Sequence, residues 1–141
     1  MKVYLKQIEG LALAARADSG HWVTMDSSEE FGGQNAGSRP VELLLMALAG
    51  CTAMDVISIL KKKRSPVTRF EMEVEGERTE EHPKVFTRIR LKYIVYGRGV
   101  KEADVQRAIE LSIEKYCSVH AMLSRATEIS TEFEIREPAA A

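Results

Sequence analysis

The most constraining feature of this 141-residue sequence is a long apolar segment that begins near Pro40. Proline suits the first turn of a helix, where its missing N–H costs nothing. Four cations at 61–64, followed by Ser65-Pro66, are typical of a helix end. Residues 43–49 are apolar on all sides and lack the polar stripe of a surface helix. One small domain hardly covers such a helix, so we expect a homodimer with this helix at or near the interface.

Alternation of apolar and charged residues predicts strands on both sides of a second helix. Acidic residues alternate with apolar ones in the first of these strands, and basic residues do so in the second, which predicts cross-strand ion pairs. We expect a short helix over 119–125 with Ser118 as its cap. The order of elements predicts an α+β fold with antiparallel sheets, in one domain of residues 1–137 with a tail at 138–141. The expected elements are a meander in the first 25 residues, strands over 70–75, 88–95 and 129–136, and a second helix over 101–116.

Charge and motif content exclude several classes of function. Twenty Lys and Arg against 21 Asp and Glu give a formal charge of −1, which excludes a strongly basic nucleic-acid binder. The N-terminus has no apolar signal region, and the uncharged stretch 43–54 is too short to cross a bilayer. We therefore expect a cytoplasmic protein without a nucleic-acid or membrane partner. His21, His82 and His120 are too far apart in sequence to favour a zinc site.

Cys51 and Cys117 are the residues that remain for chemistry, either as inert core residues or as a redox pair. Both lie on helices expected to face one interior, so the two thiols can meet if the fold brings them together. A reactive thiol needs a lowered pKa, and Asp55, one turn after Cys51, acts in the opposite direction if ionised nearby. Arg16 and Arg39 are the candidate activating cations, and the sequence does not choose between them.

Two motifs around these cysteines resemble a known family. The segment PVELLLMALAGCTA at 40–53 resembles the central-helix motif of the OsmC/Ohr proteins, and EKYCS at 114–118 resembles the second-cysteine motif of the OsmC-like branch. The resemblance implies an intertwined homodimer with two active sites at the interface. It also implies a thiol peroxidase that reduces organic hydroperoxides in oxidative-stress defence. Cys51 would be the peroxidatic thiol and Cys117 the resolving one, with an external dithiol as reductant and no metal or organic cofactor.

The sequence also departs from the family's peroxidases at the start of the long helix. Val41 stands where those enzymes carry a carboxylate after the proline, and Glu42 follows it. A shift of one residue turns a side chain by about 100° on a helix, so Glu42 points in a different direction from that carboxylate.

An alternative hypothesis is a dimeric binding module whose apolar interface pocket holds a small hydrophobic ligand. A purely structural dimer is the third hypothesis.

Overall fold

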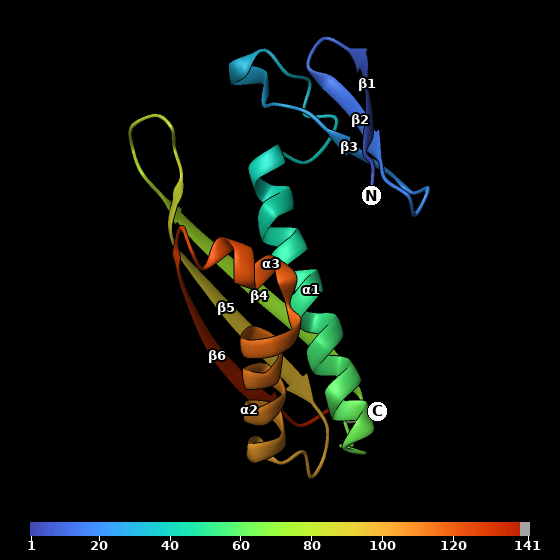
Figure 1. Cartoon of the computed structure of the whole chain (residues 1–141), viewed down its shortest axis with the longest axis vertical. Helices are drawn as coiled ribbons and strands as arrows, with labels where there is room; N and C mark the ends of the chain where they lie inside the picture. The colour runs from blue at the N-terminus through green and yellow to red at the C-terminus, as the bar shows by residue number, and fades with distance from the viewer. Residues whose placement is uncertain (139–141) are drawn as a thin grey trace. The chain divides into compact units, whose positions relative to one another are not determined.

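The structure, a computed structural model, describes residues 1–138 and divides into two compact units. The first unit is Met1–Leu44, and the second begins at Leu45. Each unit is described by itself below, with the element labels of Figure 1. The tail expected at 138–141 lies, apart from Pro138, outside the described residues.

The first unit contains a three-stranded antiparallel meander, as the sequence predicts. The turn between its last two strands includes Gly20, whose φ of 79° lies in the left-handed region that glycine adopts without strain. A short 3₁₀ turn, η1 (Glu29–Phe31), follows the meander. The strands are β1 (Tyr4–Glu9), β2 (Ala12–Arg16) and β3 (Trp22–Met25).

A buried carboxylate organises the loop that follows β3. Asp26 is 3% exposed, and its two oxygens accept hydrogen bonds from the backbone N–H groups of Ser27 (2.7 Å), Gln34 (3.0 Å) and Ala36 (3.0 Å). Gly33 fits in this loop because a Cβ there would lie 2.1 Å from the Ser27 carbonyl oxygen. The loop is therefore held by one side chain, which accepts hydrogen bonds from three backbone N–H groups.

The second unit packs helices on one face of a three-stranded sheet of order β4-β5-β6 (Figure 1). Strands β4 and β5 pair antiparallel, as expected, whereas β6 runs parallel to β5. Parallel neighbours need a long crossover, which α2, η2 and α3 provide. The elements are α1 (Pro40–Lys62, whose first turn belongs to the first unit), β4 (Arg69–Arg78), β5 (Phe86–Tyr96), α2 (Glu102–Leu111), the π-helical turn η2 (Ser112–Tyr116), α3 (Ser118–Leu123) and β6 (Glu128–Arg136).

The core of the second unit lies between the sheet and the helices. Helix α1 contributes a row of residues at a spacing of four, which places them on one face. Strand β5 contributes alternate residues, and α2 contributes its own apolar stripe. These buried residues are Leu48, Thr52, Val56 and Leu60 from α1, Ile89, Leu91, Tyr93 and Val95 from β5, and Val105, Ala108 and Ile109 from α2.

The remaining faces of α1 stay exposed. Met46, Met54 and Ile57 are 53%, 73% and 46% exposed. By length and composition alone, α1 is the one helix in residues 1–138 that could cross a membrane, with a mean hydropathy of 2.1 and 22% of its apolar window buried. The uncharged stretch 43–54, which is too short to cross a bilayer, ends before Asp55, whereas α1 continues to Lys62. Core helices of soluble proteins meet the same criterion, so this finding does not by itself identify a membrane span.

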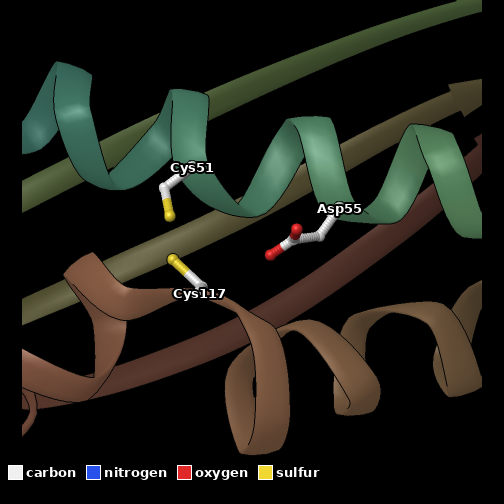
Figure 2. Close-up of side chains that lie close together, drawn as sticks. All are labelled: Cys51, Asp55 and Cys117. Atoms are coloured by element: carbon white, nitrogen blue, oxygen red, sulfur yellow. The ribbon is translucent and has the colours of Figure 1, made fainter.

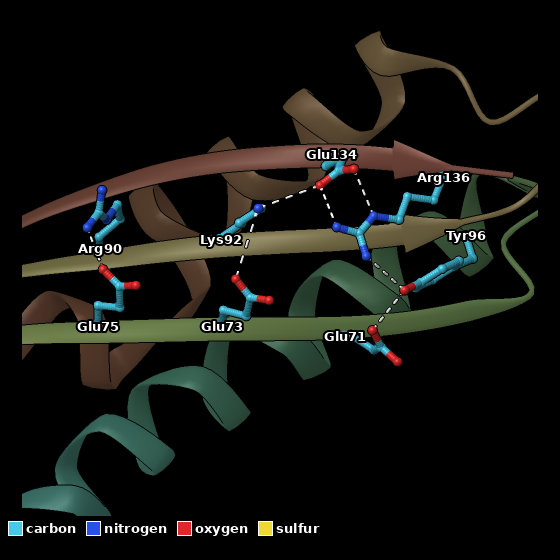
Figure 3. A network of polar contacts seen from close by, with 8 residues as sticks. All are labelled: Glu71, Glu73, Glu75, Arg90, Lys92, Tyr96, Glu134 and Arg136. Atoms are coloured by element: carbon cyan, nitrogen blue, oxygen red, sulfur yellow. Dashed lines mark hydrogen bonds and ion pairs between the residues drawn. The ribbon is translucent and has the colours of Figure 1, made fainter.

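The face of the sheet opposite the helices carries the predicted cross-strand ion pairs (Figure 3). Glu75 of β4 pairs with Arg90 of β5, and Lys92 lies 4.0 Å from Glu73. Lys92 also lies 3.6 Å from Glu134 of β6, so its charge links all three strands. These charged groups are exposed enough that each pair contributes at most about 1 kcal/mol, and they act mainly on strand register.

Replacement of Asp26 by asparagine is expected to lower the free energy of unfolding at neutral pH, because an amide has only one acceptor oxygen for three N–H groups. The hydrogen bond from the Ala36 N–H is the main cause that holds the pKa of Asp26 below its ordinary 3.8. The stabilisation is therefore fully present above pH 3.8 and disappears as the pH falls through the lowered pKa of the folded state. Urea unfolding of both proteins across pH measures the difference. Equal stabilities at pH 7 would contradict it, and Asp18→Asn, on an exposed carboxylate, is the control.

Candidate active site

The two cysteines come together in the second unit, as the resemblance to the OsmC/Ohr proteins implied. The Sγ atoms of Cys51 and Cys117 and a carboxylate oxygen of Asp55 all lie within 4.8 Å of one another. Figure 2 shows the two sulfur atoms facing each other, with the Asp55 carboxylate directed toward the pair. Both cysteines are free thiols; Cys51 is half-buried, whereas Cys117 is 2% exposed.

Helix α1 positions two of the three groups. Cys51 and Asp55 are one turn apart and therefore lie on the same side of the helix. They flank the buried row that includes Thr52 and Val56, so packing of that row on the sheet fixes the direction in which they point. The half-buried position of Cys51 follows from its place at the border of the buried face.

A widened helical turn positions the third group. The backbone N–H of Cys117 donates to the Ser112 carbonyl at 2.8 Å, which closes the π-helical turn η2 at the end of α2. Cys117 then becomes the N-cap of α3, and its Sγ accepts a hydrogen bond from the His120 backbone N–H at 3.3 Å. Ser118, expected to be this cap, is instead the first residue of α3. The predicted helix over 101–116 is thus α2 followed by η2.

A chain of buried hydroxyl groups leads from the sheet to Asp55. The Tyr93 and Thr52 oxygens are 2.7 Å apart, those of Thr52 and Ser112 are 2.9 Å apart, and Ser112 donates to Asp55 Oδ2 at 3.0 Å. A hydroxyl has a single hydrogen and a carboxylate has none. The single Ser112 hydrogen therefore lies between two acceptors, Thr52 Oγ1 and Asp55 Oδ2, and either atom of the Thr52–Tyr93 pair can be the donor.

The sequence did not predict this row of hydrogen-bonded hydroxyl groups. Thr52 and Ser112 are fully buried, but a single threonine or serine between apolar residues is common and does not indicate a network. The available signal was that Thr52 lies four residues from both Leu48 and Val56, in the middle of the buried row. A polar side chain at such a position needs a partner, although the sequence does not say which one.

Burial controls the protonation of the site. Desolvation raises the pKa of Cys117 to about 11, with further contributions from the hydrogen bond and charge of Cys51 and from Asp55. The His120 N–H acts in the opposite direction but does not compensate. Desolvation likewise raises the pKa of Tyr93 to about 12, so the hydroxyl chain begins with a neutral phenol. Cys117 is therefore a thiol at neutral pH in this arrangement.

The residues at the start of α1 have structural partners. The Glu42 carboxylate accepts a hydrogen bond from the Arg39 backbone N–H at 2.8 Å, which is half of a capping box. Val41 is the residue before Glu42 in the sequence. The Arg39 side chain donates to Asn35 and to the Gly37 carbonyl.

Arg16 lies over the rings of Tyr4 and Trp22, at 5.9 and 5.1 Å from their centroids. Arg16 and Arg39 both belong to the Met1–Leu44 unit, whereas the thiols belong to the other unit. The activation of Cys51 by one of these two arginines therefore stays a prediction.

Known proteins share the sequence and the fold of this chain. The chain is 45% identical to protein YhfA of Escherichia coli K12, over 96% of this chain and 98% of YhfA. The crystal structure of a hypothetical protein from Aquifex aeolicus matches with a TM-score of 0.85 and 34% identity, over 97% of this chain and 96% of that one. An organic hydroperoxide resistance protein OsmC from Legionella pneumophila shares the fold, with a TM-score of 0.66 and 12% identity, over 95% and 97% of the two chains. Residues 32–132 match the family described as OsmC-like protein, and the chain belongs to that family.

Proposed function

We propose that this chain is a cytoplasmic peroxidase that uses Cys51 and Cys117 to reduce organic hydroperoxides. The observation that carries the proposal is the meeting of two free thiols from separate helices within 4.8 Å. The fold shared with an organic hydroperoxide resistance protein supports the choice of substrate class. The half-buried thiol is the one that a peroxide reaches first, which supports Cys51 as the attacking group.

The reaction balances with these two thiols. The Cys51 thiolate attacks one peroxide oxygen, the O–O bond breaks, and the departing alkoxide takes a proton and leaves as an alcohol. Cys51 is then a sulfenic acid. The Cys117 sulfur attacks the Cys51 sulfur, an S–S bond forms, and the hydroxyl group leaves as water. An external dithiol reduces this disulfide by two exchange steps and restores both thiols.

A second candidate function rests on a cavity elsewhere in the same unit. It has a volume of about 390 Å³ and lies where α1 ends and β4 begins. Apolar side chains and cations line it together, which suits a small hydrophobic ligand with an anionic group. Neither cysteine belongs to its lining, so the thiols would have no part in this binding function. Its lining includes Ile57, Leu60, Lys61, Arg64, Val67 and Phe70.

We also propose that a second copy of the chain covers the exposed faces of α1. The row Leu48–Thr52–Val56–Leu60 already packs inside the chain, which favours a core helix over a membrane span. The remaining apolar side chains of α1 form a surface that a partner of the same kind would remove from water.

The peroxidase proposal predicts rapid loss of both thiols after addition of one equivalent of cumene hydroperoxide to the reduced protein. In Cys51→Ser only Cys117 remains, buried and protonated, so its oxidation is expected to be at least about a hundredfold slower. Thiol titration over time measures both rates. Unchanged thiols in the wild-type protein, with a hydrophobic ligand found in its native mass spectrum, would favour the binding function instead.

A different result is expected for Cys117→Ser. Its Cys51 sulfenic acid has no intramolecular thiol to attack it, because the chain contains only two cysteines. Under excess peroxide it is expected to proceed to sulfinic acid, a gain of two oxygen atoms in the intact mass. If the wild-type protein shows the same gain under the same conditions instead of an intramolecular disulfide, Cys117 is not the resolving residue.

The dimer proposal predicts that Met54→Glu dissociates the protein. Met54 is 73% exposed in the single chain, where a glutamate is harmless, but an unpaired charge buried in an interface costs about 3 kcal/mol or more. The dimer dissociation constant then rises more than about a hundredfold. Sedimentation velocity measures the change, with Met122→Glu on α3, 64% exposed, as the matched control. A wild-type protein that sediments as a monomer would contradict the proposal.

A further inference from the structure

The site contains a third group that the peroxidase reaction does not use. The Asp55 carboxylate lies within 4.8 Å of both sulfur atoms, so Cys51, Asp55 and Cys117 form a cluster of three convergent side chains (Figure 2). We propose that the reduced site binds one zinc-type divalent cation through the two sulfurs and one Asp55 oxygen. No histidine side chain is a ligand in this proposed site. The proposal departs from the expectation that the protein takes no metal.

The donor set suits this class of cation. Zinc accepts cysteine sulfur at about 2.3 Å and carboxylate oxygen at about 2.0–2.2 Å, in a tetrahedral arrangement. Ligand atoms at those distances are about 3.5–3.8 Å apart, by tetrahedral geometry. The three atoms now lie within 4.8 Å of one another, so binding requires side-chain rotations that bring them closer together. Two sulfur ligands favour zinc and its softer analogues over magnesium or calcium, and the fourth position stays open to a water molecule.

The surroundings of Asp55 hold the carboxylate in place for such a role. Ser112, which is fully buried, donates to Oδ2 at 3.0 Å and is itself held by Thr52. A hydrogen bond of this kind to a ligating carboxylate orients the ligand and commonly changes metal affinity by about 10- to 100-fold. Cys51 and Asp55 come from adjacent turns of one helix, so two of the three ligands are pre-positioned by rigid backbone.

Metal binding and peroxide reduction would exclude each other at this site. A disulfide between Cys51 and Cys117 removes both sulfur ligands, and a bound cation occupies the sulfur electron pairs that attack peroxide. The inference concerns the same residues as the proposed function, but it needs only the reduced thiols and not peroxide turnover. The two proposals can therefore fail separately.

The test is a titration of the fully reduced protein with Cd²⁺, followed by the ultraviolet thiolate-to-cadmium charge-transfer band. Zn²⁺ affinity is measured by competition with a chromogenic chelator. We expect one equivalent of either ion per chain and loss of binding in the disulfide form. Asp55→Asn is expected to weaken Zn²⁺ binding by at least about tenfold, and Ser112→Ala by about tenfold. Asp104→Asn, on a surface carboxylate that pairs with Lys63, is the matched control and should bind as the wild-type protein does.

Two results would overturn the inference. One is the absence of a charge-transfer band in the reduced wild-type protein, a measurement that needs no variant to fold. The other is an Asp55→Asn protein with unchanged circular dichroism that binds Zn²⁺ as tightly as the wild-type protein. A protein that reduces cumene hydroperoxide without binding Cd²⁺ refutes the metal site alone. One that binds Cd²⁺ without losing thiols to peroxide refutes the peroxidase alone.

Discussion

The packing of one face of α1 on the sheet is the constraint on which the rest of the second unit depends. Four residues at a spacing of four, from Leu48 to Leu60, are removed from water by the buried side chains of β5 and α2. One of the four is Thr52, whose hydroxyl links Tyr93 of the sheet to Ser112 at the end of α2. Apolar burial provides the driving force for this contact, whereas the hydroxyl chain favours one rotation of the helix about its axis.

That fixed rotation determines the chemistry. With Thr52 directed into the core, Cys51 and Asp55 lie on the adjoining side of α1, toward the turn that carries Cys117. The widened turn η2 presents Cys117 to them, since the continuation of a regular α-helix would direct this side chain elsewhere. Insertions of this kind occur frequently at functional sites in helices. The π-helical turn η2 and the packed face of α1 thus act together to bring the two cysteines close to Asp55.

Much of the fold could be predicted from the sequence, because its signals were local. The period of two in β4 and β5 and the boundaries of α1 at Pro40 and near Lys62 depend on neighbouring residues alone. The pattern of residues left the meeting of Cys51 and Cys117 conditional on the fold, and the resemblance to the OsmC/Ohr proteins implied it. The parallel pairing of β6 was not predictable, because strand direction depends on the crossover path and not on the strand's own residues.

Other features escaped prediction because they join residues that are distant in sequence. The N–H groups of Gln34 and Ala36 that converge on Asp26, and the partners of Thr52, are visible only once the chain has folded. The π-helical turn η2 could not be predicted from the spacing of apolar residues, because Val105, Ile109, Ile113 and Cys117 recur at every fourth residue in the sequence, as in a regular α-helix.

The parallel position of β6 has a consequence for the order in which the protein matures on the ribosome. The segment that carries Cys117 is tethered at both ends only after β6 has joined β5, and β6 follows every other strand of residues 1–138 in the sequence. Cys51 emerges long before its partner is in place. During translation the first thiol therefore stands alone until the segment from α2 to β6 has been made.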